Sequence, residues 1–290
     1  MYKITFLTEW PVEGEPDGIA VSPDGEVFVT VNNNHRVVKY SKEGVQLAQW
    51  PFEGAASGIA VGHEGEVFIA TNHKNRDVNH GTQGEVSVTI NNNYRVVKTN
   101  SEGVRLAEWS SEGESSGIAV SPEGEVFVNI NQNYRDLEYK TNGEISVNIN
   151  QNYRVVKYSS EGAELGEWPI EDPSSCLATN SGGEVFSVNN MLRVVKSSTV
   201  GDRLAEWSVV AGVIETNGIV INPEGEVFVS VNNNHRVVKY SPDGELLLMW
   251  GGEGDQPGEF RSPVGVALDS DGLVYVADKG NRRVQVFRCP

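Results

Sequence analysis

Residues Gly18–Trp50 have the sequence GIAVSPDGEVFVTVNNNHRVVKYSKEGVQLAQW. It holds four short runs rich in Val, Phe and Tyr, which are separated by turn signals such as Ser-Pro-Asp-Gly. Pro23 pre-sets φ for a turn, and Gly25 and Gly44 can adopt positive φ. The pattern predicts four antiparallel strands, here named a, b, c and d in chain order, joined by tight turns.

The same unit recurs along all 290 residues, and each predicted d strand ends on a tryptophan. The chain opens on a strand d and closes on strands a, b and c, so pairing its two ends would complete the last sheet and protect its edges. The sequence therefore predicts an all-β fold, a six-bladed β-propeller forming one domain over residues 1–290. We expect the N-terminal strand to pair with the C-terminal three strands. The six tryptophans are Trp10, Trp50, Trp109, Trp168, Trp207 and Trp250.

Two blades are longer than the others. Segments 58–116 and 117–175 have 59 residues each, and each repeats its b–c pattern at an offset of 19 residues. Nineteen residues are too few for a four-stranded blade, whereas two added strands preserve the alternation of strand direction. We therefore expect six blades, two of which carry an extra hairpin in the order a–b–c–b′–c′–d. The alternative is a ring of eight irregular blades.

The charge and the cysteine content limit the classes of partner and the cellular compartment that we expect. The chain has 23 Lys and Arg against 40 Asp and Glu, a formal net charge of −17. This charge disfavours nucleic acid as the partner and weakly favours a basic one. Cys176 and Cys289 form no disulfide framework, which suggests a reducing compartment. Because we find no signal peptide and no apolar membrane span, we expect a cytoplasmic monomer without membrane contact.

The C-terminal stretch Pro263–Phe287, PVGVALDSDGLVYVADKGNRRVQVF, and its equivalents resemble the NHL repeat, named for an Asn-His-Leu signature. The resemblance covers essentially the whole chain and implies a propeller. The family includes interaction domains of tripartite-motif ubiquitin ligases, RNA-binding translational regulators, bacterial sensor domains and an amidating lyase. This sequence departs from the family pattern, because the usual Asp at the end of strand b survives only at Asp278. It also shows no RING, B-box or coiled coil.

Alternating strand direction places the b–c and d–a connections on one face of the ring, here called the b–c face. Its b–c turns are rich in Asn and carry His or Tyr followed by Arg. Asn tolerates the left-handed region and bonds turn backbone, so a structural role accounts for most of this pattern. The alternative is a polar ring that binds a peptide or nucleic acid. The predicted binding residues are Asn34, His35, Arg36, Asn93, Tyr94, Arg95, Asn152, Tyr153, Arg154, Arg193, Asn234, His235, Arg236, Arg282 and Arg283.

Strand a is expected to line the central channel with apolar runs such as Gly-Ile-Ala-Val, which carry no carboxylate, His or Lys. The five histidines form no ligand motif, and no HExxH, GxSxG or P-loop pattern occurs. We therefore expect no catalytic residues, no metal site and no cofactor. The main hypothesis is a non-enzymatic scaffold that binds a protein or peptide. The alternatives are an RNA-binding post-transcriptional regulator and a metal-dependent propeller lyase or hydrolase.

Overall fold

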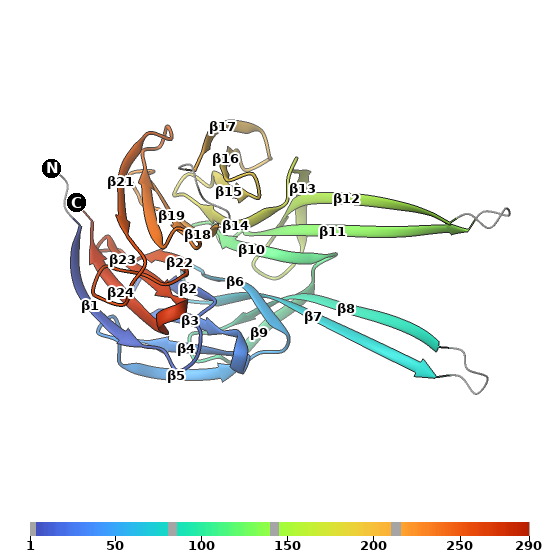
Figure 1. Cartoon of the computed structure of the whole chain (residues 1–290), viewed down its shortest axis with the longest axis horizontal. Coiled ribbons are helices and arrows are strands. Elements are labelled where there is room, and N and C mark those ends of the chain that lie inside the picture. The colour runs from blue at the N-terminus through green and yellow to red at the C-terminus, as the bar shows by residue number, and fades with distance from the viewer. Residues whose placement is uncertain (1–3, 81–85, 140–144, 210–215, 290) are drawn as a thin grey trace.

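The structure, a computed structural model, describes residues 4–80, 86–139, 145–209 and 216–289. Its strands form six antiparallel sheets of four strands, which are arranged as the blades of a ring (Figure 1). Within each blade the strands follow the predicted order from a at the centre to d at the rim. The six-bladed ring is thereby confirmed, and the eight-blade alternative is wrong.

Blades 1 to 5 each take four consecutive strands of the chain. Blades 1 and 2 comprise β2 (Gly18–Val21), β3 (Val27–Val31), β4 (Arg36–Tyr40), β5 (Gln46–Pro51), β6 (Ala55–Val61), β7 (Val67–His80), β8 (Val86–Thr99) and β9 (Arg105–Ser110). Blades 3 and 4 comprise β10 (Glu114–Val120), β11 (Val126–Tyr139), β12 (Ile145–Tyr158), β13 (Glu164–Pro169), β14 (Ser174–Thr179), β15 (Val185–Asn189), β16 (Arg193–Ser197) and β17 (Arg203–Ser208). Blade 5 comprises β18 (Thr216–Ile221), β19 (Val227–Val231), β20 (Arg236–Tyr240) and β21 (Leu246–Gly251).

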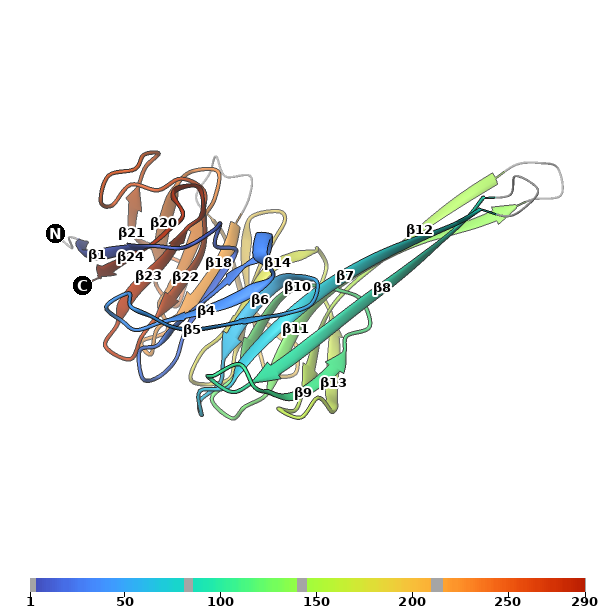
Figure 2. The same ribbon diagram turned by 90° about the horizontal axis from the view of Figure 1, so that it is seen from below.

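Blade 6 closes the ring with both ends of the chain. Its sheet joins β22 (Pro263–Leu268), β23 (Leu273–Asp278) and β24 (Arg283–Arg288) to β1 (Thr5–Pro11). Strand β1 pairs antiparallel with β24, and the two ends of the chain lie together in Figures 1 and 2. The predicted pairing of the N-terminal strand with the C-terminal three strands is confirmed.

The extra residues of blades 2 and 3 lengthen existing strands and add none. Strands β7, β8, β11 and β12 have 14 residues each and run beyond the ring as two ribbons (Figure 2). In blade 1 Val31 lies opposite Arg36 across the b–c turn, and in blade 2 Thr71 lies opposite Arg95. The 19 inserted residues therefore extend the b–c hairpin outward.

The predicted order a–b–c–b′–c′–d is wrong for a physical reason. Strand d must stay beside strand c, because its tryptophan packs against the next blade. Val96 lies opposite Trp109 in blade 2, in the same register as Val37 opposite Trp50 in blade 1. Two strands inserted between c and d would move Trp109 outward by about 10 Å, since neighbouring strands are about 4.8 Å apart. Lengthening the hairpin leaves this register intact.

In five of the six blades, the tryptophan at the end of strand d packs over a glycine in the c–d turn of the following blade. Blade 5 is the exception. A Cβ on Gly162 would lie 2.6 Å from the indole of Trp109, and φ at Gly162 is +86°. Only glycine satisfies both the backbone and the close approach. The same contact joins Gly44 to Trp10, Gly103 to Trp50, Gly201 to Trp168 and Gly244 to Trp207. Trp250 faces the chain ends and packs on Phe287, with ring centroids 6.0 Å apart.

A buried lysine on strand c forms a second link between blades. The ammonium of Lys39 lies 5.9 Å from the ring centre of Phe28 and 2.9 Å from a carboxylate oxygen of Glu26. It also lies 2.9 Å from Glu102, in the c–d turn of blade 2. Burial by itself lowers the pKa of Lys39, but its bonds to Glu102 and Glu26 outweigh burial and raise that pKa. Lys98 repeats the arrangement with Glu161 of blade 3 at 3.0 Å.

The tryptophan contact predicts unequal effects for two glycines of blade 3. Gly124 has φ +82° with no atom near a built Cβ, whereas Gly162 meets Trp109. G124A should cost roughly 1–2 kcal/mol through backbone strain alone. G162A should cost roughly 1–3 kcal/mol more because of overpacking. Urea unfolding of both variants checks this, and equal losses would show that the tryptophan contact contributes nothing.

The hairpin insertion predicts that the ring tolerates removal of either ribbon. Deleting residues 72–90 joins Thr71 to Asn91 and leaves the four-residue turn Asn-Asn-Asn-Tyr before Arg95, as in blade 1. The variant should fold with a melting temperature within about 3 °C of the parent, a shift of roughly 1 kcal/mol. Thermal unfolding followed by circular dichroism measures this. Failure to fold would place the ribbon inside the structural core.

Candidate functional site

The b–c face gathers the turns that follow strand b and the connections that lead into strand a. The short b–c turns reverse at a residue in the left-handed region, with φ of 47° at His35 and 53° at His235. Leu192 and Arg282 occupy the same position in blades 4 and 6, with φ of 60° and 53°. Both ribbons leave the ring from this face, because they are extended b–c hairpins. The face therefore combines four short b–c turns with two projecting ribbons.

The two histidines hold the connection into the next blade. The Nδ1 atom of His35 contacts the carbonyl of Gly54, and its ring packs edge-on against Phe52 at 6.2 Å. Nδ1 of His235 accepts a hydrogen bond from the backbone N–H of Ser262 at 3.0 Å. These contacts give both predicted histidines a structural role.

Arg36 and Arg154 connect neighbouring elements through several partners each. Arg36 donates to the backbone carbonyl of Glu13 at 2.7 Å and to its carboxylate at 3.1 Å. Arg154 is nine-tenths buried and lies 3.0 Å from Glu112 and 2.7 Å from Glu167. The carboxylates of Glu13 and Glu112 are themselves 81% and 75% exposed. Each arginine is therefore neutralised by an acid that solvent still reaches.

Three further arginines also pair with carboxylates. Arg283 is buried, and it bonds Asp278 at 2.8 Å and Glu9 at 2.9 Å. Arg95 pairs with Glu108, and Arg193 donates to Glu206 at 2.7 Å. The predicted ring of arginines is thus brought to one face, but carboxylates accompany it. It does not form a bare cationic surface among the described residues.

The remaining predicted residues differ in accessibility. Arg282 has a side chain 65% exposed and lies 3.9 Å from Glu15. Asn34 and Asn152 are exposed, whereas Asn234, Arg236 and Tyr94 are half-buried. Asn93 accepts a bond from Arg95, and the carbonyl of Tyr153 accepts one from the N–H of Ile170. The accessible members of the predicted set are therefore Asn34, His35, Asn152, Arg193 and Arg282.

The Asn that follows strand b in blades 1 and 2 has a role that the sequence interpretation missed. Oδ1 of Asn32 accepts from the N–H of Ala56 at 2.7 Å, and its Nδ2 donates to the same residue's carbonyl at 2.9 Å. Asn72 repeats the pair with Ser115 in blade 3. These Asn side chains bind strand a of the next blade. Each Asn lies one residue after the position at which the family pattern has Asp. Their recurrence at this position was the available signal.

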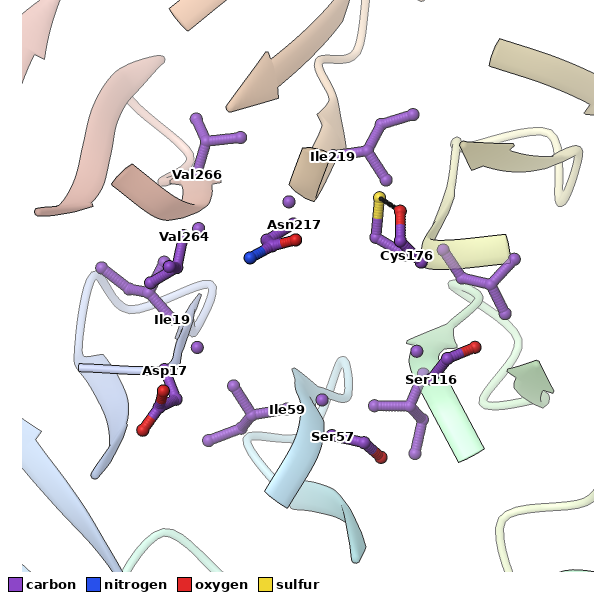
Figure 3. A pocket seen from close by; sticks show the side chains of 18 residues that line it. Asp17, Ile19, Ser57, Ile59, Ser116, Cys176, Asn217, Ile219, Val264 and Val266 are labelled. Carbon is purple, nitrogen blue, oxygen red and sulfur yellow. Dashed lines mark hydrogen bonds between the residues drawn. The ribbon is translucent and has the colours of Figure 1, made fainter. Parts of the chain in front are cut away.

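The central channel opens on the b–c face through a narrow hollow of about 70 Å³ (Figure 3). One residue per blade precedes the apolar run of strand a and faces this opening, including Ser57, Ser116 and Asn217. Asp17 is the carboxylate that the sequence interpretation missed, since it lies just before that run. Its carboxylate forms an ion pair with Lys279 at 2.5 Å and accepts a hydrogen bond from the N–H of Asn32 at 3.0 Å.

Cys176 replaces glycine in the channel wall and is buried. Burial raises the pKa of its thiol to about 12, so the thiol stays protonated and unreactive at neutral pH. No group of three His, Cys, Asp or Glu positioned to hold a metal ion occurs among the described residues. In the same part of the chain, no helix is long and apolar enough to span a bilayer.

The fold and the turns of this face define a β-propeller built from repeats. Residues 14–40 and 260–287 match the family profile described as the NHL repeat. The chain is 49% identical over 41 residues to the E3 ubiquitin-protein ligase TRIM71 of Xenopus tropicalis, covering 14% of this chain and 5% of that protein. It is 50% identical over 42 residues to human NHL repeat-containing protein 3, covering 14% of this chain and 12% of that protein. The chain is therefore a six-bladed β-propeller that matches the NHL repeat at two places, and it spans only a small part of the curated relatives it matches.

Solved structures confirm the architecture over the full length. Virginiamycin B lyase from Staphylococcus aureus superposes with a TM-score of 0.63 and 12% identity, covering 99% of both chains. A streptogramin B lyase superposes with a TM-score of 0.61 and 14% identity, covering 100% of this chain and 98% of the other. At this identity the likeness shows the fold alone.

Proposed function

We propose that this chain is a non-enzymatic scaffold that binds a protein or peptide on its b–c face. The observation that carries the proposal is the pairing of the face's arginines with carboxylates, as at Arg36, Arg154 and Arg193. A phosphate backbone would have to displace those carboxylates, because nucleic-acid binding depends on unneutralised Lys and Arg. A polypeptide brings both donors and acceptors and can hydrogen-bond to such pairs.

The ribbons support a polypeptide partner for a second reason. Strand β6 pairs with β7 only as far as Asn72, and β9 pairs with β8 only as far as Arg95. Beyond those residues the outer edges of the ribbon in blade 2 have no neighbouring strand among the described residues. An open edge offers backbone N–H and C=O groups to an added strand of a partner. The NHL family, which this chain resembles, includes interaction domains of ubiquitin ligases, and this agrees with a role in binding.

Affinity capture tests the proposal with variants chosen by exposure. The triple variant N34A/R193A/R282A alters accessible side chains of the b–c face, while R105A alters an exposed arginine at the start of β9 and serves as the control. Proteins retained by the parent from nuclease-treated lysate should fall about tenfold with the triple variant, a loss of about 1.4 kcal/mol. R105A should retain them.

Two results would contradict the proposal. Retention that is equal for the parent and the triple variant would remove the b–c face as the binding surface. Loss of all retained material on nuclease treatment, with RNA crosslinking to the parent, would favour the RNA-binding alternative.

A further inference from the structure

The opposite end of the channel opens on the face that carries the a–b turns, here called the a–b mouth. This mouth is a hollow of about 330 Å³. The last residue of each strand a forms its floor, and all six are half-buried. They are Val21, Val61, Val120, Thr179, Ile221 and Leu268. Five of the six are aliphatic, and the hydroxyl of Thr179 already donates to the carbonyl of Val120 at 2.8 Å. The floor is therefore almost wholly apolar.

Two concentric rings surround this floor. Two residues after each floor position comes an exposed rim residue, which is proline in blades 1, 3 and 5. One residue further on, five blades carry an exposed acid: Asp24, Glu64, Glu123, Glu224 and Asp271. None of these five forms an ion pair with another described residue. The lysine-linked acids such as Glu26 are separate groups on the same turns.

Blade 4 interrupts the acidic ring. Its three equivalent positions are Thr179, Ser181 and Gly182, so this sector has no charge. The mouth thus has an apolar centre, an acidic surround on five sides and one neutral exit. The prolines give the rim fixed φ angles and little freedom to collapse into the hollow.

We propose that the a–b mouth is a second docking site, which takes a basic peptide segment with one large aliphatic side chain at its centre. The aliphatic side chain would cover the floor, and burial of apolar area provides the main gain in free energy. Lys or Arg on either side would lie over the acids, which would speed association and exclude acidic segments. The volume suits a short segment, since small-molecule sites in proteins begin near 300 Å³.

Fluorescence anisotropy with three labelled pentapeptides tests this site. The probes are Lys-Lys-Leu-Lys-Lys, the apolar-deficient Lys-Lys-Ser-Lys-Lys and the charge-reversed Glu-Glu-Leu-Glu-Glu. The parent should bind the first about tenfold more tightly than the second, and should not bind the third. Affinity for the first should fall as salt rises from 50 to about 300 mM, because exposed charges are then screened.

Matched variants locate the binding. The triple variant E64Q/E123Q/E224Q removes acids of the mouth, and E164Q/E245Q removes exposed acids at the outer strands of blades 3 and 5. Ser181→Trp at the exposed rim should block the hollow without touching the core. The first and third variants should each weaken binding about tenfold, while E164Q/E245Q should bind as the parent does.

Equal affinity for the Leu and Ser peptides would overturn the proposal, since the aliphatic floor would then play no part. Equal loss with E164Q/E245Q would show general attraction to an acidic protein. The b–c triple variant N34A/R193A/R282A should bind the peptide normally, which separates this site from the proposed scaffold function.

Discussion

The contact between a tryptophan at the end of strand d and a glycine in the next blade is the constraint on which this structure depends. It fixes where strand d must lie, which residue can occupy the c–d turn, and how far one blade stands from the next. The lysine on strand c reinforces it, because Lys39 and Lys98 reach acids in the same turn. The contact links five of the six blade junctions, and at the sixth Trp250 packs on Phe287 of blade 6, so the ring needs its last blade completed. Strand β1 supplies that completion.

The same constraint explains what the ring permits elsewhere. An insertion between strands c and d would separate Trp109 from Gly162, whereas an insertion in a b–c turn leaves the contact untouched. Both 19-residue duplications are of the second kind, and both produce ribbons outside the ring. The faces differ as well. The b–c face pairs arginines such as Arg36 and Arg154 with acids, while five acids around the apolar hollow of the a–b face form no ion pair with another described residue.

The sequence predicts the ring because one tryptophan marks the end of strand d in each blade. Trp10 precedes the first complete blade, which indicates that its strand belongs to the last blade. The sequence interpretation misjudged the duplications because b–c hairpins and long ribbons share the same alternation of apolar and polar residues. Tertiary register, not local pattern, selected between them. The sequence predicted that the arginines lie in the b–c turns, but it did not predict their acceptors. Glu13 and Glu112 lie in connections that are distant in sequence from Arg36 and Arg154. Asp17 was overlooked because it lies just before the apolar run that lines the channel.

Closure by β1 makes one cooperative ring, and the ribbons lie outside it. Native-state hydrogen exchange read by mass spectrometry can test this cooperativity, because exchange reports which segments open together. We expect the amides of β1 to be protected as strongly as those of β24. We also expect residues 73–80 and 86–94 of the ribbon to exchange much sooner than the blades. Fast exchange in β1 with β24 still protected, or ribbons as protected as the blades, would contradict these expectations.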